Sequence, residues 1–210
     1  ALHDDSRVTA ICDWEQIPEE EGGTADRQQL DYSGEDPVLF CLRNQLQTLS
    51  PLHWKTNLEA VGGFDESLPC SQERDLHLRL ACNGINFSYI PEVLFRVRRQ
   101  PNSVSADYDR VLNQHGRIFE RSYNKLESMG TLTDIRAAAF AEAVSKDARQ
   151  CLRRGNTSLA KEYFSLANAM YPDGALNAFH RRDLQLVARL FGPMVAERVC
   201  KVALHLGVRV

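Results

Sequence analysis

The chain lacks the patterns that would mark a metalloprotein or a protein that crosses a membrane. Its six cysteines include no C-x-x-C pair, and its six histidines include no H-E-x-x-H or H-x-H, so no zinc site is predicted. No apolar run approaches the ~20 residues that span a bilayer, and the start shows no signal-peptide pattern. We therefore expect six reduced thiols and a location in the cytoplasm. Because the first residue is Ala1 rather than methionine, we also expect a trimmed or partial product.

An excess of charge of one sign is lacking too. The chain has 25 lysines and arginines and 28 aspartates and glutamates. The resulting net charge of −3 argues against a general nucleic-acid binder. Hydrophobic residues make up 43% of the 210 positions, which is enough for a sizeable core. This length allows one large domain or two small ones.

The composition changes near residue 105. Short apolar runs, turns and most of the prolines lie before it, so residues 1–105 are predicted to form an α/β unit. Residues 15–36 are polar and predict an exposed loop. The residues from 38 to 43 fit a strand or a short helix equally well. The clearest elements are strands at 8–14, 86–90 and 93–97 and helices at 56–61 and 72–83.

Residues 106–210 are predicted to be all helical. Thr133 caps a helix that reaches about residue 153, and a second helix follows from 157 to 171. The second resembles one helix of a tetratricopeptide repeat, but only one copy is present, whereas arrays need about three. We expect a helical hairpin, followed by amphipathic stretches at 175–191 and 193–206.

Two carboxylates open the helix of residues 72–83. Glu73 and Asp75 stand in the string Q-E-R-D-L-H-L-R-L, and Gly62-Gly63-Phe64-Asp65-Glu66 precedes it. A carboxylate at this place has two interpretations: it can serve as a general base in a cleft, or it can stabilise the first turn of the helix.

This order of motifs resembles the acceptor-side half of family 2 glycosyltransferases, which have the GT-A fold and transfer a sugar from a nucleotide-diphosphate donor with inversion. The resemblance covers roughly residues 5–105. It implies a partial GT-A-like mixed sheet that lacks the N-terminal nucleotide-binding half and is followed by an all-α extension. It also places Glu73 where the family has its catalytic base, usually an aspartate, and Asp75 at the second acid of the motif.

The resemblance also implies residues that contact the acceptor sugar. Gly63 and Asp65 belong to the loop that borders the acceptor pocket in the family. Trp54 just before this loop has two interpretations, stacking on a sugar face or packing in the core.

Donor-side contacts are expected from the arginines after residue 95. Arg98 and Arg99 fit bidentate contacts to a diphosphate, or protection of an exposed strand edge. Gln100 stands where many relatives carry a histidine that approaches the metal. The resemblance implies a divalent cation, Mg²⁺ or Mn²⁺, in the parent enzyme, with Asp-x-Asp ligands outside this chain. Asp107-Tyr108-Asp109 matches that string in letters, but its position favours acids in the first turn of a helix.

The sequence therefore predicts a portion of an inverting glycosyltransferase that acts on a saccharide or a lipid-linked saccharide and is inactive by itself. The alternatives are a non-catalytic interaction module, for which Tyr163 and Phe164 would supply a groove, and a degenerate transferase scaffold. Peripheral contact with the inner face of a membrane is a further possibility, because basic and apolar residues share the last two amphipathic stretches. Those basic residues are Arg181, Arg182, Arg189, Arg198, Lys201 and Arg209.

Overall fold

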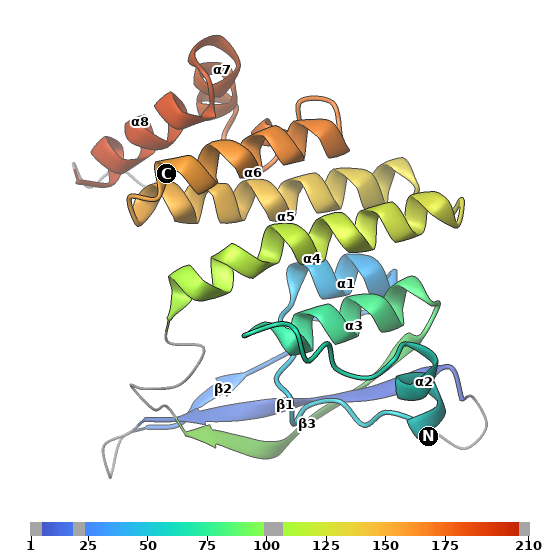
Figure 1. Cartoon of the computed structure of the whole chain (residues 1–210). Coiled ribbons are helices and arrows are strands. Elements are labelled where there is room, and N and C mark those ends of the chain that lie inside the picture. Colours follow the sequence, from blue (N-terminus) through green and yellow to red (C-terminus); the bar gives the residue numbers. More distant parts are fainter. Residues whose placement is uncertain (1–5, 19–23, 99–106, 206–210) are drawn as a thin grey trace. The chain divides into compact units, whose positions relative to one another are not determined.

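The computed structural model describes residues 6–18, 24–98 and 107–205. The chain divides into two compact units, Ala1–Gln114 and His115–Val210 (Figure 1). The predicted change of architecture after residue 105 falls in the stretch 99–106, which lies outside the described residues. No helix in the described ranges is long and apolar enough to cross a membrane.

The first unit is built on a small mixed sheet of three strands. Strands β1 (Val8–Ile17), β2 (Asp26–Gln28) and β3 (Asn86–Arg98) lie in the order β2-β1-β3. The central strand β1 pairs antiparallel with β2 and parallel with β3. The mixed α/β class expected for the first part of the chain is confirmed at this level.

Two details of the sheet differ from the prediction. Pro91 does not separate two strands, because β3 continues through it and the register shifts between Cys12 and Trp14 of β1. Ile90 lies opposite Cys12 and Val93 opposite Asp13, so the irregularity takes up the two intervening residues of β3.

The segment after β1 is not a plain exposed loop. It contains β2 and then Leu30, which is buried. Asp13 lies fully buried and accepts hydrogen bonds from the backbone of Leu30, the guanidinium of Arg27 and the hydroxyl of Tyr89. Burial alone would raise the pKa of Asp13, but these donors lower it below its ordinary value. The buried carboxylate thus ties the segment to the sheet.

Three helices complete the described core of this unit: α1 (Pro37–Arg43), α2 (Lys55–Ala60) and α3 (Gln72–Cys82). Capping decides the ambiguous residues 38–43 in favour of a helix, since Asp36 accepts a hydrogen bond from Val38 and Pro37 stands at the first helical position. Helices α1 and α3 pack against each other (Figure 1). Leu76, Leu80 and Ile85 form a core cluster on which Leu58 and Val61 pack.

The second unit is helical. Helix α4 (Tyr108–Ser128) begins in the first unit, and α5 (Asp134–Arg153) and α6 (Thr157–Met170) form the predicted hairpin. The prediction that Thr133 caps α5 is confirmed, because its side chain accepts a hydrogen bond from Arg136.

The stretch 175–191 is not one helix. A 3₁₀ turn at Gly174–Leu176 is followed by a short connection, and α7 begins only at Arg182 and ends at Phe191. The turn is set by close packing, because a Cβ at Gly174 would lie 2.0 Å from the carbonyl oxygen of Ala167. The last helix, α8 (Pro193–His205), agrees with the prediction.

Candidate functional site

A pocket of about 390 Å³ opens at the N-terminus of α3, within the first unit. Amide and hydroxyl side chains dominate its walls, and one carboxylate is among them. The lining residues are Gln45, Leu46, Gln47, Thr48, Pro69, Cys70, Ser71, Gln72, Glu73 and Val111. Such groups combine hydrogen-bond donors and acceptors, which is the set that recognises hydroxyl-rich ligands.

Glu73 is the second residue of α3, and its side chain is half-buried in the pocket wall. Its Oε1 accepts a hydrogen bond of 2.5 Å from the hydroxyl of Thr48. The contact directs the carboxylate toward the segment 45–48, which is 25 residues away in sequence. A carboxylate held in this way at a cavity wall is positioned to take a proton from a bound hydroxyl.

Ser71 sets the backbone geometry at the N-terminus of α3. It adopts a left-handed backbone with φ of 63°, which costs a non-glycine residue about 1 kcal/mol or more. It stands at the N-cap position, yet its side chain does not cap the helix. Its buried hydroxyl oxygen has no hydrogen-bond partner within the described part of the chain. A polar atom of this kind in a pocket wall is available to a ligand.

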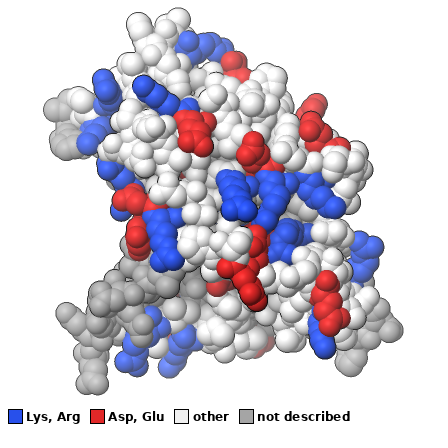
Figure 2. Space-filling model, in the orientation of Figure 1, with Lys and Arg blue, Asp and Glu red and all other residues white. Residues whose placement is uncertain are grey.

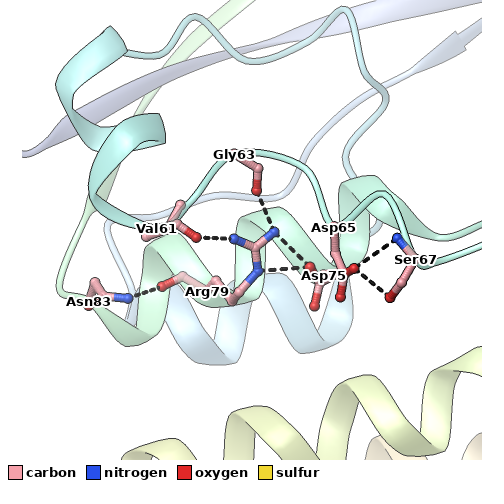
Figure 3. Close-up of polar contacts among 7 residues, drawn as sticks. All are labelled: Val61, Gly63, Asp65, Ser67, Asp75, Arg79 and Asn83. Carbon is pink, nitrogen blue, oxygen red and sulfur yellow. Dashed lines mark hydrogen bonds and ion pairs between the residues drawn. The ribbon is translucent and has the colours of Figure 1, made fainter.

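Asp75 has a different environment from Glu73. It is fully buried, and its Oδ2 accepts a hydrogen bond of 2.8 Å from Nε of Arg79, one helical turn later. Arg79 also donates to the backbone carbonyls of Val61 and Gly63 (Figure 3). Asp75 therefore orients the arginine that fastens the loop after α2 to α3, and its carboxylate faces this contact rather than the pocket.

The glycine loop is ordered by its own polar contacts. Gly62 and Gly63 have φ of 79° and 66°, a conformation that glycine adopts without strain. Asp65 accepts hydrogen bonds from the backbone and hydroxyl of Ser67 (Figure 3). Neither Gly63 nor Asp65 lines the pocket at Glu73.

The other candidate contacts lie away from the pocket lining. Trp54 precedes α2 and is 42% exposed, so it is not a core residue. Arg98 is exposed at the end of β3. Arg99 and Gln100 lie outside the described residues. Asp107 accepts a hydrogen bond from the backbone of Arg110, as expected for an acid at the start of a helix.

The fold also stacks two histidines that the sequence shows only as scattered. The rings of His53 and His77 lie 5.5 Å apart, and His53 contacts the hydroxyl of Thr9. His77 is buried, and burial together with the neighbouring His53 lowers its pKa to about 3. Both rings are therefore neutral at pH 7, since burial lowers the pKa of His53 as well.

Sequence reasoning did not identify Gln45, Gln47, Thr48 or Ser71 as site residues. Each has an ordinary side chain in a segment without a motif, and only the fold brings the stretch 45–48 against Glu73.

Comparison of the chain with family models, with curated proteins and with solved structures finds no match. The assignment of function therefore depends on the motifs and on the geometry of the pocket.

Proposed function

We propose that this chain is the acceptor-side portion of an inverting glycosyltransferase with a GT-A-like fold. The observation that carries the proposal is the carboxylate of Glu73, held by Thr48 in the wall of a polar pocket. The mixed sheet followed by helices is compatible with the motif resemblance.

In the proposed reaction, this chain performs one chemical step, a proton transfer. As the acceptor hydroxyl oxygen bonds to the anomeric carbon of the donor sugar, its proton passes to the carboxylate of Glu73. The bond between the anomeric carbon and the diphosphate breaks, and the nucleoside diphosphate leaves with the electron pair. Thr48 holds Glu73 in position, and the amides of Gln45 and Gln47 are suited to bind neighbouring hydroxyls of the acceptor.

The remaining predicted contacts keep distinct proposed roles. Trp54 and Asp65 are candidate contacts for an extended saccharide on the surface of the same unit, with Gly63 shaping the loop between them. Arg98, together with Arg99, is the candidate contact for the donor diphosphate. Asp75 is a positioning residue, because Arg79 occupies its carboxylate.

The divalent cation expected for such an enzyme has no candidate site among the described residues. Within residues 6–18, 24–98 and 107–205, no group of three or more His, Cys, Asp or Glu side chains could hold a metal. We propose that the Asp-x-Asp ligands belong to the donor-binding half, and no step is assigned to the metal.

The alternative of an interaction module on the helical hairpin receives less support. Tyr163 and Phe164 were the aromatics expected to line its groove, and both are buried in the second unit. The hydroxyl of Tyr163 instead accepts a hydrogen bond from the backbone of Gly116.

The proposal is tested by steady-state kinetics of the natural full-length protein that contains these residues. Sugar transfer from nucleotide-diphosphate sugars to saccharide acceptors is measured for the wild type and for Gln47→Ala and Thr48→Val. Gln47→Ala should raise KM for the acceptor by roughly tenfold and leave KM for the donor unchanged, since a lost hydrogen bond is worth about 1.5 kcal/mol. Thr48→Val removes the hydroxyl that holds Glu73, so it should instead lower kcat by roughly tenfold.

Thr157→Val serves as the matched control, because Thr157 is exposed at the start of α6 in the other unit. Absence of any transfer by the wild type, or an unchanged acceptor KM in Gln47→Ala together with an unchanged kcat in Thr48→Val, would remove the assignment.

A further inference from the structure

Helix α7 exposes an apolar stripe on the side opposite to its core contacts. Leu184 and Ala188 are buried, whereas Leu186 and Leu190 are exposed and lie one turn apart on the other side of the helix. Leu190 and the following Phe191 are 65% and 67% exposed, although large apolar side chains are commonly buried.

Helix α8 repeats the arrangement. Ala196 and Cys200 are buried, and Val195, Val199 and Val202 form an exposed stripe at spacings of three and four residues. The two helices pack against each other across Gly192, whose φ of 87° permits the turn. Two neighbouring helices thus each present a second apolar face that no described residue covers.

Basic side chains border both stripes. On α7, Arg182 lies four residues before Leu186 and Arg189 lies three residues after it. On α8, Arg198 lies three residues after Val195 and four before Val202. Residues 181–204 hold five basic side chains against Asp183 and Glu197, whereas the whole chain has a net charge of −3. Glu197 is buried between Arg149 and Arg153, whereas Arg181 and Arg189 form exposed ion pairs with Asp183 and Asp173. The five basic side chains still outnumber these two exposed acids. Figure 2 shows white and blue atoms prevailing over red where α7 and α8 lie in Figure 1.

We propose that the α7–α8 hairpin binds an anionic phospholipid surface. The apolar stripes and Phe191 enter the boundary between headgroups and acyl chains, and the arginines and Lys201 contact lipid phosphates. An apolar stripe flanked by long basic side chains is the pattern of helices that lie in the membrane interface. The local excess of positive charge in a chain of negative net charge provides the complementarity to an anionic surface. This inference is independent of the chemistry at Glu73.

The test is flotation of the whole chain with vesicles of phosphatidylcholine alone or with about one quarter phosphatidylglycerol. The wild type should bind the anionic vesicles and not the neutral ones, and binding should weaken strongly near 0.5 M NaCl, where screening is short-ranged. Leu190→Gln with Phe191→Gln should reduce partitioning roughly tenfold or more through lost apolar contact. Arg198→Gln with Lys201→Gln should reduce it roughly 25-fold at low salt, at about fivefold per charge.

Control variants distinguish binding through this surface from non-specific adsorption to vesicles. Ile135→Gln removes an equally exposed apolar side chain from α5, and the double variant Lys125→Gln with Lys161→Gln removes exposed charges from α4 and α6. Both control variants should bind like the wild type. Circular dichroism verifies that each variant is folded. Equal binding to neutral vesicles, or undiminished binding of the α7–α8 variants, overturns the proposal. So does a dimer in light scattering that becomes monomeric in Leu190→Gln with Phe191→Gln without any vesicle binding, because a second copy would then cover the face.

Discussion

Replacing Arg79 with methionine tests the contact that fastens the glycine loop to α3. The guanidinium donates to the carboxylate of Asp75 at 2.8 Å and to the carbonyls of Val61 and Gly63 at 2.5 and 2.7 Å. Arg79→Met keeps most of the apolar stem but leaves the buried carboxylate of Asp75 without this cation.

The magnitude follows from burial. Breaking a fully buried pair costs about 3–5 kcal/mol, because the remaining charge is uncompensated. The side chain of Asp75 is fully buried, but that of Arg79 is 19% exposed, so water partly replaces the lost donor. We therefore expect Arg79→Met to reduce the free energy of unfolding by about 2–4 kcal/mol.

The assay is urea unfolding followed by tryptophan fluorescence. Both tryptophans, Trp14 and Trp54, belong to the first unit, so the signal reports on the unit that contains Arg79. Lys55→Met is the matched control, since Lys55 makes an exposed i,i+4 pair with Glu59. Such pairs contribute about 0.3–0.5 kcal/mol, so a small effect is expected.

A double variant sharpens the interpretation. Asp75→Leu combined with Arg79→Met removes both charges, and it should be more stable than Arg79→Met alone by at least about 1 kcal/mol, because the buried carboxylate is removed together with its cation. A loss below about 1 kcal/mol for Arg79→Met, or no recovery in the double variant, would refute the structural role given to Asp75.

Three further predictions concern the buried groups. Because the pKa of His77 is near 3 when folded and about 6.5 when unfolded, stability is full above pH 6.5 and falls with decreasing pH, by up to about 2 kcal/mol at pH 5. His77→Leu should reduce the change of the urea midpoint between pH 7 and pH 5, whereas replacing the exposed His180 with leucine should not. An equal change in the two variants would contradict the role given to His77. Gly174→Ala should destabilise the second unit in circular dichroism by about 3 kcal/mol through its clash with the Ala167 carbonyl, against about 1 kcal/mol for Gly130→Ala, where only φ is strained; equal losses would argue against the packing. All six cysteines are buried thiols outside disulfide bonds, so the native chain should react with less than one equivalent of a thiol reagent until urea is added. Rapid labelling would be inconsistent with the fold.

Most elements of this fold could be predicted because their signals are local. Thr133 predicts the start of α5, and regular apolar spacing predicts α3 and the α5–α6 hairpin. The continuation of β3 through Pro91 could not be predicted, because it depends on a shift in the pairing with β1 that leaves Pro91 and Glu92 of β3 without partners in the register. The split of 175–191 has a similar cause, since Gly174 is placed by its contact with α6 rather than by its own neighbours.

In the candidate site, too, some features follow from the local sequence and others only from tertiary contacts. Motif spacing singles out Glu73 and Asp75 together, but it cannot tell which carboxylate is buried against an arginine and which lines a pocket. Thr48 and Ser71 carry no signal in the sequence, because their importance arises only from contacts across the fold. The stacking of His53 on His77 is equally a product of tertiary structure.

The most direct test of the central claim is the turnover number of Glu73→Gln in the natural full-length protein, measured beside Glu66→Gln. Glu66 lies exposed in the glycine loop of the same unit and serves as the matched carboxylate. General-base catalysis predicts that Glu73→Gln lowers kcat by roughly 10²–10⁴-fold, while acceptor binding and the activity of Glu66→Gln are preserved. Undiminished turnover in Glu73→Gln would contradict the account, because the pocket would then hold no catalytic base.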